Sequence, residues 1–264
     1  MLKELKFAVY SIGMNLRNSA ELRTSFLMNM LGMALNDVAF IVLWCIFAQV
    51  VGRIGGWTVM DVVAMQGIAA LNFGLVFSLL NGVTQISNYV GMGNFDRFLL
   101  SPKNLLLRIC VSKFGVSALG DVLFGFLCLC AYILIVKISA VQMLLLATGV
   151  IISSFVMFSM MLLSQAVSFF LMDPRSGTRG LFELFLTPSL FHGGAFQGGL
   201  RLFFTFIIPA LLTGALPVDA VRNISWPQLG FIALLASLWL LISIWFFYKG
   251  VRRYESANLT TFGT

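Results

Sequence analysis

Three ionisable side chains, Asp37, Lys113 and Asp121, lie inside long apolar segments of this sequence. A charged group in lipid is costly, so each is expected to face protein or a water-filled path. If 105–136 is one helix, Lys113 and Asp121 lie about two turns apart on one face, too far for direct pairing. They could line a path for substrate or ions. Alternatively, they could join helices, or Lys113 could extend its amine to the membrane surface.

The sequence lacks the usual motifs of an enzyme. His192 is the only histidine, so a multi-histidine metal site is excluded, and no lysine follows a glycine as the phosphate-binding loop requires. The four cysteines lie in apolar runs without CxxC spacing, which is typical of buried hydrophobic residues. We therefore expect no catalytic residue, no metal and no cofactor in this chain.

The composition is that of an integral membrane protein. Hydrophobic residues make up 59% of the 264 residues and charged residues 10%, and the mean hydropathy is +0.97. Soluble domains carry about 25% charged residues. The net charge of +7 is explained by basic residues that flank membrane spans rather than by nucleic acid binding.

The apolar runs predict an all-α membrane protein formed by a single domain, 1–264. Residues 3–24 alternate charged and apolar side chains at helical spacing, which predicts an amphipathic helix at the membrane interface. The six predicted spans are approximately 26–51, 60–80, 105–136, 141–172, 180–196 and 229–248. Prolines and glycines interrupt the region before the last span, so 200–224 is predicted to form a broken re-entrant hairpin on the outer side. Its candidate gate residues are Phe203, Phe204, Phe206, Pro209 and Pro217.

The distribution of basic residues predicts the orientation. With six spans and the N-terminus inside, 13 of the 17 lysines and arginines fall on the interior side. Basic residues favour the cytoplasmic side, so both termini are expected in the cytoplasm. Asp61 and Glu183 lie near predicted span ends and are expected to be solvated.

The interval after the second span, "GNFDRFLLSPKN", combines both signs of charge with apolar residues and a proline. Phe95, Leu99 and Leu100 could fill a groove on a partner protein, while Asp96 and Arg97 make polar contacts and Pro102 ends the helix. This interval is the best candidate for receiving force from another protein. The alternative is a solvated loop with an apolar side toward the membrane.

The layout resembles the permease subunits of ABC-2 type ABC transporters, in particular six-span exporters that work with a separate ATPase. The matching features are the predicted surface helix 3–24, the phrase "GNFDRFLLSPKN" and "GGLRLFFTFIIPALLTGALP" before the last span. The stretch "FHGGAFQGG" departs from the family in its glycine content. The resemblance covers nearly the whole chain in organisation and says almost nothing about cargo.

The resemblance implies a permease of the bacterial cytoplasmic membrane, embedded in lipid, that pairs with a second copy or a homologous permease. Two ATPase subunits would bind ATP and Mg, and the surface helix and first interior loop would seat on them. The matching loop positions are Gly93, Asn94, Phe95, Asp96, Arg97, Leu99, Leu100 and Pro102. The broken pieces around Pro209 and Pro217 would close the pathway on the outer side.

The sequence is also compatible with other functions. An ion-coupled secondary transporter would use Asp37 and Asp121 as carriers, although it would need discontinuous helices near the membrane midplane. An intramembrane enzyme is disfavoured by the lack of clustered nucleophiles, and a structural assembly protein is a further alternative. Peptide, lipid, drug-like and polysaccharide cargo all stay open.

Overall fold

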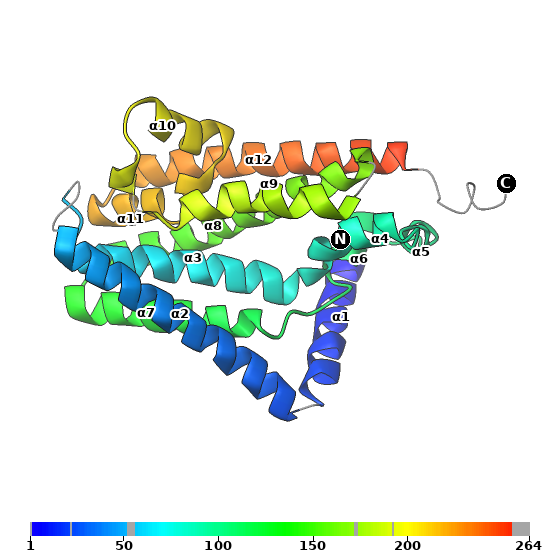
Figure 1. Ribbon diagram of the computed structural model, residues 1–264, viewed down its shortest axis with the longest axis horizontal. Helices are drawn as coiled ribbons and strands as arrows, with labels where there is room; N and C mark the ends of the chain where they lie inside the picture. The colour runs from blue at the N-terminus through cyan, green and yellow to red at the C-terminus, as the bar shows by residue number, and fades with distance from the viewer. Residues whose placement is uncertain (1, 22, 52–55, 172–173, 192, 255–264) are drawn as a thin grey trace.

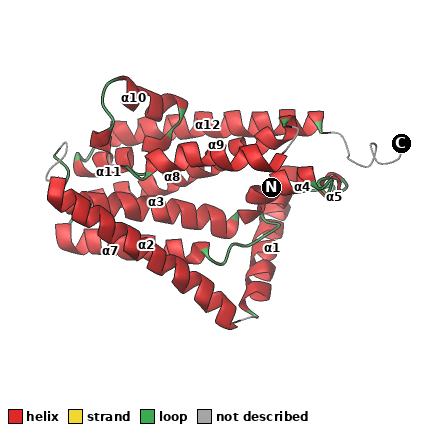
Figure 2. Ribbon diagram, in the orientation of Figure 1, coloured by secondary structure: helices red, strands yellow, loops and turns green. Residues whose placement is uncertain are grey.

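A computed structural model describes the chain except for residues 1, 22, 52–55, 172–173, 192 and 255–264. The described residues form helices and loops without strands (Figure 2), which confirms the all-α prediction. Among them, five helices are long and apolar enough to cross a membrane, rather than the six expected. They are α2 (Arg23–Val51), α3 (Val59–Leu79), α7 (Ala118–Val136), α8 (Ala140–Ala166) and α12 (Trp226–Arg253).

The long helices pack lengthwise into one bundle (Figure 1). Helix α3 packs against α7 and α8, α8 packs against α12, and α2 runs obliquely across α3 and α7. Helix α1 (Leu2–Ala20) runs across one end of the bundle, transverse to the other helices. A helix is therefore confirmed where the surface helix was predicted, while its place at a membrane interface stays a prediction.

Short helices gather at the two ends of the bundle (Figure 1). We call the end that contains α1 the elbow end, and it also carries α4 (Ile86–Gly91), α5 (Asp96–Leu99) and α6 (Leu105–Cys110). The opposite end, called the far end, carries α10 (Gly199–Leu202) and α11 (Ala215–Arg222).

Glycines bring α2, α3 and α7 into close contact. A Cβ atom on Gly125 of α7 would lie 2.7 Å from the carbonyl oxygen of Gly67 on α3. A Cβ atom on Gly120 would lie 2.8 Å from the backbone nitrogen of Ala34 on α2. Lipid provides little hydrophobic drive between helices, so small residues that admit close backbone packing hold such bundles together. The contact at Gly120 also places the neighbouring turns of α2 and α7 side by side.

The third predicted span, 105–136, is wrong as a continuous helix. Helix α6 ends at Cys110 and α7 begins at Ala118, with a turn between them. In this turn the backbone nitrogen of Gly115 donates to the carbonyl oxygen of Ser78 at 3.1 Å. Lys113 is exposed there, and its Nζ lies 3.1 Å from Oε1 of Gln85. Lys113 therefore lies outside the spanning helix and shares no helical face with Asp121.

The fifth predicted span, 180–196, is also corrected. Helix α9 (Pro174–Ser189) starts earlier, ends earlier and has 16 residues. At ~1.5 Å per residue it is about 24 Å long, short of the ~30 Å hydrocarbon layer, and it is not one of the five candidate spans.

The region before α12 is broken into short pieces, as expected for 200–224. After α10 come a π-helical turn (Phe203–Ile207) and a 3-10 turn (Ala210–Thr213), which lead into α11. The buried Asn72 of α3 holds the 3-10 turn, because its Nδ2 donates to the carbonyl oxygen of Thr213 at 2.9 Å. Whether these pieces enter the membrane stays a prediction.

Candidate functional site

The stretch Gly93–Pro102, which we call the elbow, is anchored by a buried phenylalanine. Phe95 is fully buried, and its ring centroid lies 5.1 Å from those of both Phe169 and Tyr254. Phe169 lies in the 3-10 turn (Val167–Phe170) that follows α8, and Tyr254 follows α12. The hypothesis that Phe95 fills a groove on a partner is therefore wrong, because its side chain is already enclosed by its own chain.

Two leucines form the exposed apolar surface of the elbow. Leu99 is 45% exposed and Leu100 is 88% exposed, at the end of α5. Beside them, the exposed Arg97 places its guanidinium carbon 4.6 Å from the ring centroid of Tyr89 and 4.8 Å from that of Phe98. Such stacking restrains the long side chain. The elbow thus presents a leucine pair next to a positioned positive charge.

The remaining elbow residues fix its path. Gly93 has φ of +69°, a left-handed conformation that a residue with a side chain rarely adopts, where the chain turns out of α4. Asn94 and Pro102 are exposed. Asp96 is half-buried beside Tyr254, and burial together with the nearby Asp96 charge raises the pKa of the Tyr254 phenol.

Helix α1 is attached to the segment that directly follows the elbow. The Nζ atom of Lys103 lies 4.6 Å from the ring centroid of Phe7, and Nδ2 of Asn15 donates to the carbonyl oxygen of Val111 at 2.9 Å. Nη1 of Arg108 donates to the carbonyl oxygen of Arg97 at 3.1 Å, which closes the elbow onto α6. The two elements predicted to meet an ATPase therefore form one connected surface.

The predicted outer gate residues differ in their burial and in the elements against which they pack. Phe203 and Phe206 are 41% and 44% exposed, and Phe206 packs on Phe231 of α12 with centroids 5.9 Å apart. Phe204 packs on Phe196 at 4.9 Å. Pro209 and Pro217 are buried, where they pack α11 and its preceding turn onto the bundle.

A network of ion pairs closes the far end. Nε of Arg222 lies 3.4 Å from Oδ1 of Asp61, and its Nη2 donates to the carbonyl oxygen of Gly56 at 2.7 Å. Asp219 lies 3.8 Å from Arg222 and 3.9 Å from Arg201. This network joins α11 to the N-terminus of α3.

The two carboxylates predicted to be solvated, those of Asp61 and Glu183, differ in their exposure to solvent. Asp61 is 5% exposed, and its Oδ2 accepts hydrogen bonds from the backbone nitrogen and Oγ1 of Thr58 at 2.8 Å each. The expectation that Asp61 is solvated is therefore wrong, because it caps α3 from within the bundle. Glu183 is solvated as expected, since its side chain is 55% exposed beside Arg179.

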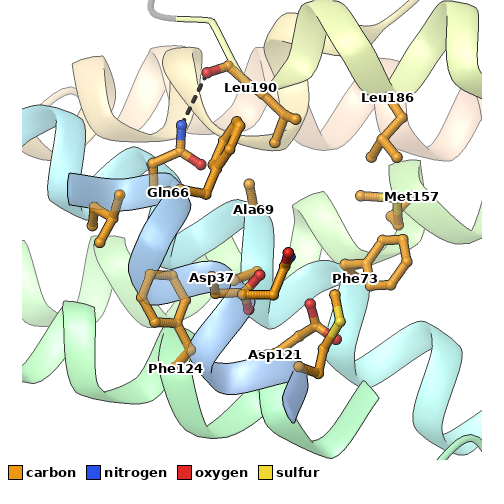
Figure 3. Close-up of a pocket in the computed structure, with 14 residues that line it drawn as sticks. Asp37, Gln66, Ala69, Phe73, Asp121, Phe124, Met157, Leu186 and Leu190 are labelled. Carbon is orange, nitrogen blue, oxygen red and sulfur yellow. Dashed lines mark hydrogen bonds between the residues drawn. The ribbon is translucent and has the colours of Figure 1, made fainter. Parts of the chain in front are cut away.

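Asp37 and Asp121 meet in a cavity between α2, α3 and α7 (Figure 3). Their carboxyl groups lie within hydrogen-bonding reach of each other, and the buried Oδ2 of each accepts no hydrogen bond from a donor group of the described residues. The cavity has a volume of about 270 Å³. Gln66 and Leu190 lie at its edge, where Nε2 of Gln66 donates to the carbonyl oxygen of Leu190 at 3.0 Å.

Comparison with known proteins assigns the chain to a family. The family described as ABC-2 family transporter protein matches residues 33–258, which include the elbow, the cavity and the far end. The chain belongs to the ABC-2 transporter family. No curated protein and no solved structure matched it.

Membership makes this ABC-2 protein a multi-pass membrane component of a transporter and not itself catalytic. Members of the family generally work with ATPase subunits. Helix α1 precedes the matched residues, so the match itself says nothing of that helix. His192, the single histidine of the sequence, lies outside the described residues.

Sequence reasoning missed three parts of these sites in the ABC-2 protein. It placed Asp121 on one helical face with Lys113, because the helix break at 111–117 was hidden by flanking apolar residues. The polar and small residues Ser112, Lys113, Gly115 and Ser117 were the available signal for that break. No local signal pairs Asp61 with Arg222 or encloses Phe95, because both depend on segments far apart in the chain.

Proposed function

We propose that this ABC-2 protein is the membrane-spanning permease subunit of an ATP-driven exporter. Two separate ATPase subunits bind ATP and Mg and hydrolyse the nucleotide, and a second copy or a homologous permease completes the pathway. The protein lies in the lipid of a bacterial cytoplasmic membrane with both termini in the cytoplasm. The elbow end then faces the ATPases and the far end faces outward.

The observation that carries this proposal is the exposed leucine pair of the elbow, which lies over a buried and well-packed phenylalanine. Leu99 and Leu100 are exposed, whereas Phe95 beneath them packs against Phe169 and Tyr254. Exposed apolar side chains on a well-packed support are typical of protein docking sites. Force applied to the leucines would reach α8 through Phe169 and α12 through Tyr254.

This path runs through α8 and α12 rather than through α6 and α7. The break between α6 and α7 interrupts any rigid connection there, while α8 continues for 27 residues before its 3-10 end. In our proposal, movement of α8 and α12 shifts the far end, where α10, α11 and the intervening turns form the re-entrant outer gate. The ion pairs of Arg222 hold this gate closed at rest.

The test exchanges the leucine pair for serine. We expect the Leu99→Ser, Leu100→Ser variant to insert into membranes normally but to lose most of the ATPase that co-purifies with the wild-type protein. A tenfold weaker complex corresponds to about 1.4 kcal/mol. ATP hydrolysis by the reconstituted complex, measured in liposomes, should fall with complex formation.

Ile224→Ser is the matched control, since Ile224 is 49% exposed at the far end. It should retain the ATPase at the wild-type level. Equal retention by both variants would show that the leucine pair is not the docking site. Transport by the wild-type protein without any ATPase would overturn the function itself.

A second function is favoured by one observation, the facing carboxyl groups of Asp37 and Asp121. An ion-coupled secondary transporter could use such a pair as its ion carrier. Transport that follows an imposed proton or sodium gradient in the absence of ATP would establish this alternative. Transport that requires ATP hydrolysis and ignores the gradient would exclude it.

A further inference from the structure

The acid pair in the cavity has no basic counterpart in the described part of the chain. The ion pairs found there join Arg179, Arg201 and Arg222 to carboxylates other than Asp37 and Asp121. Asp121 is only 4% exposed, and its Oδ2 is buried without a hydrogen-bond partner. A buried carboxylate is normally paired, so this arrangement leaves room for a positively charged group from outside the chain.

The rest of the cavity wall is apolar. Ten of its 14 lining residues are hydrophobic, and they come from α2, α3, α7, α8 and the end of α9. Three of them, Phe40, Phe73 and Phe124, bring aromatic rings to the site. Aromatic faces attract cations, and apolar walls favour a hydrophobic body.

We propose that this cavity binds a small hydrophobic molecule with one protonated amine, held with its ammonium group between Asp37 and Asp121. The inference deepens the proposed export function by naming its substrate class. The volume of about 270 Å³ lies near the lower end of the roughly 300–1,000 Å³ typical of ligand pockets. It therefore suits a compact amine rather than a peptide or polysaccharide chain.

Other ligand classes fit less well. An anion would face two carboxyl groups, and a neutral apolar molecule would leave the negative charge of the acid pair without a counterion. The described residues contain no group of three His, Cys, Asp or Glu side chains suited to a metal ion. A bare inorganic cation would also leave most of the apolar wall unused.

The cavity is placed where a bound molecule could affect the gate. Leu186 and Leu190, at the end of α9, form one wall, and Gln66 of α3 holds the carbonyl oxygen of Leu190 at 3.0 Å (Figure 3). The chain continues from Leu190 toward α10 at the far end. A ligand between the acid pair and α9 therefore contacts the segment that leads to the proposed gate.

Equilibrium binding to the purified full chain in lipid nanodiscs at pH 7 tests the site. The probes are 4-phenylbutylamine, its neutral analogue 4-phenylbutan-1-ol and the anion 4-phenylbutyrate, which share the same hydrophobic body. We expect the amine to bind at least tenfold more tightly than the alcohol, and the anion not to bind. Equal binding of amine and alcohol, or binding of sodium alone with no binding of the amine, would overturn the proposal.

Two substitutions test whether the amine is bound by Asp37 and Asp121. Asp37→Asn and Asp121→Asn should each weaken amine binding at least tenfold while alcohol binding changes less than twofold. Glu183→Gln is the matched control, since it removes an exposed carboxylate outside the cavity and should bind the amine as the wild type does. Unchanged amine binding in both Asn variants would refute the assignment. Alcohol binding reports on whether each variant keeps its cavity.

The binding experiment needs no ATPase, so its outcome is separate from that of the proposed function. Amine binding without ATP-dependent transport would keep the site and reject the exporter. ATP-dependent export of a cargo that does not compete with 4-phenylbutylamine would keep the exporter and reject the substrate class.

Discussion

The two ends of the bundle are held together by different kinds of contact. At the elbow end, aromatic rings from the elbow, α8 and α12 enclose Phe95. At the far end, Arg222 of α11 joins the buried Asp61 of α3 and also Asp219 of its own helix, and the Arg222 and Asp219 side chains are 28% and 19% exposed. The packing energy of a buried ring falls steeply when the ring is displaced, whereas ion pairs near water can separate and form again. The difference fits an elbow that transmits movement and a far end that opens.

The largest expected effect is at the elbow. Phe95→Ala should lower the free energy of unfolding by about 3–5 kcal/mol, because it empties a fully buried site. Phe206→Ala is the control at the far end, where the ring is 44% exposed, and should change stability by less than about 1.5 kcal/mol. Reversible denaturation in detergent measures both. Equal losses would remove the proposed contrast in packing.

An intermediate effect is expected from the far-end ion pairs. Arg222→Met should lower the free energy of unfolding by about 1–3 kcal/mol, because Asp61 is left buried without its partner. Arg201→Met should change it by less than about 1 kcal/mol, since the Arg201 side chain is 51% exposed. Thermal unfolding at low and high salt measures both. Equal effects of the two substitutions would mean that Asp61 does not depend on Arg222.

The smallest effect concerns pH at the elbow. The folded protein raises the pKa of Tyr254 above 10, so the unfolded chain loses this phenolic proton first as pH rises. The contribution of Tyr254 to stability is therefore complete below about pH 10 and is lost as pH rises through the folded value. Between pH 9 and 11, the wild type should lose thermal stability faster than Tyr254→Phe. Parallel curves for the two proteins would show that the phenol is not restrained by the elbow.

Local sequence patterns predicted the spanning helices well where a long apolar run has clear ends. Helices α2, α3, α8 and α12 lie within a few residues of the predicted spans. The prediction failed where the run of apolar residues passed through a turn, as between α6 and α7. It also failed for α9, because hydropathy does not reveal where a helix around Pro188 begins and ends.

Apolar runs and short motifs are local properties, so the amino-acid sequence was enough to predict a helical membrane protein and to indicate its family. That Asp37 faces Asp121, that Arg222 reaches Asp61 and that Phe95 turns inward became known only from the folded arrangement of the helices. Each of these contacts joins residues from separate helices. Their neighbours depend on how closely glycines such as Gly120 let those helices approach, which no single segment encodes.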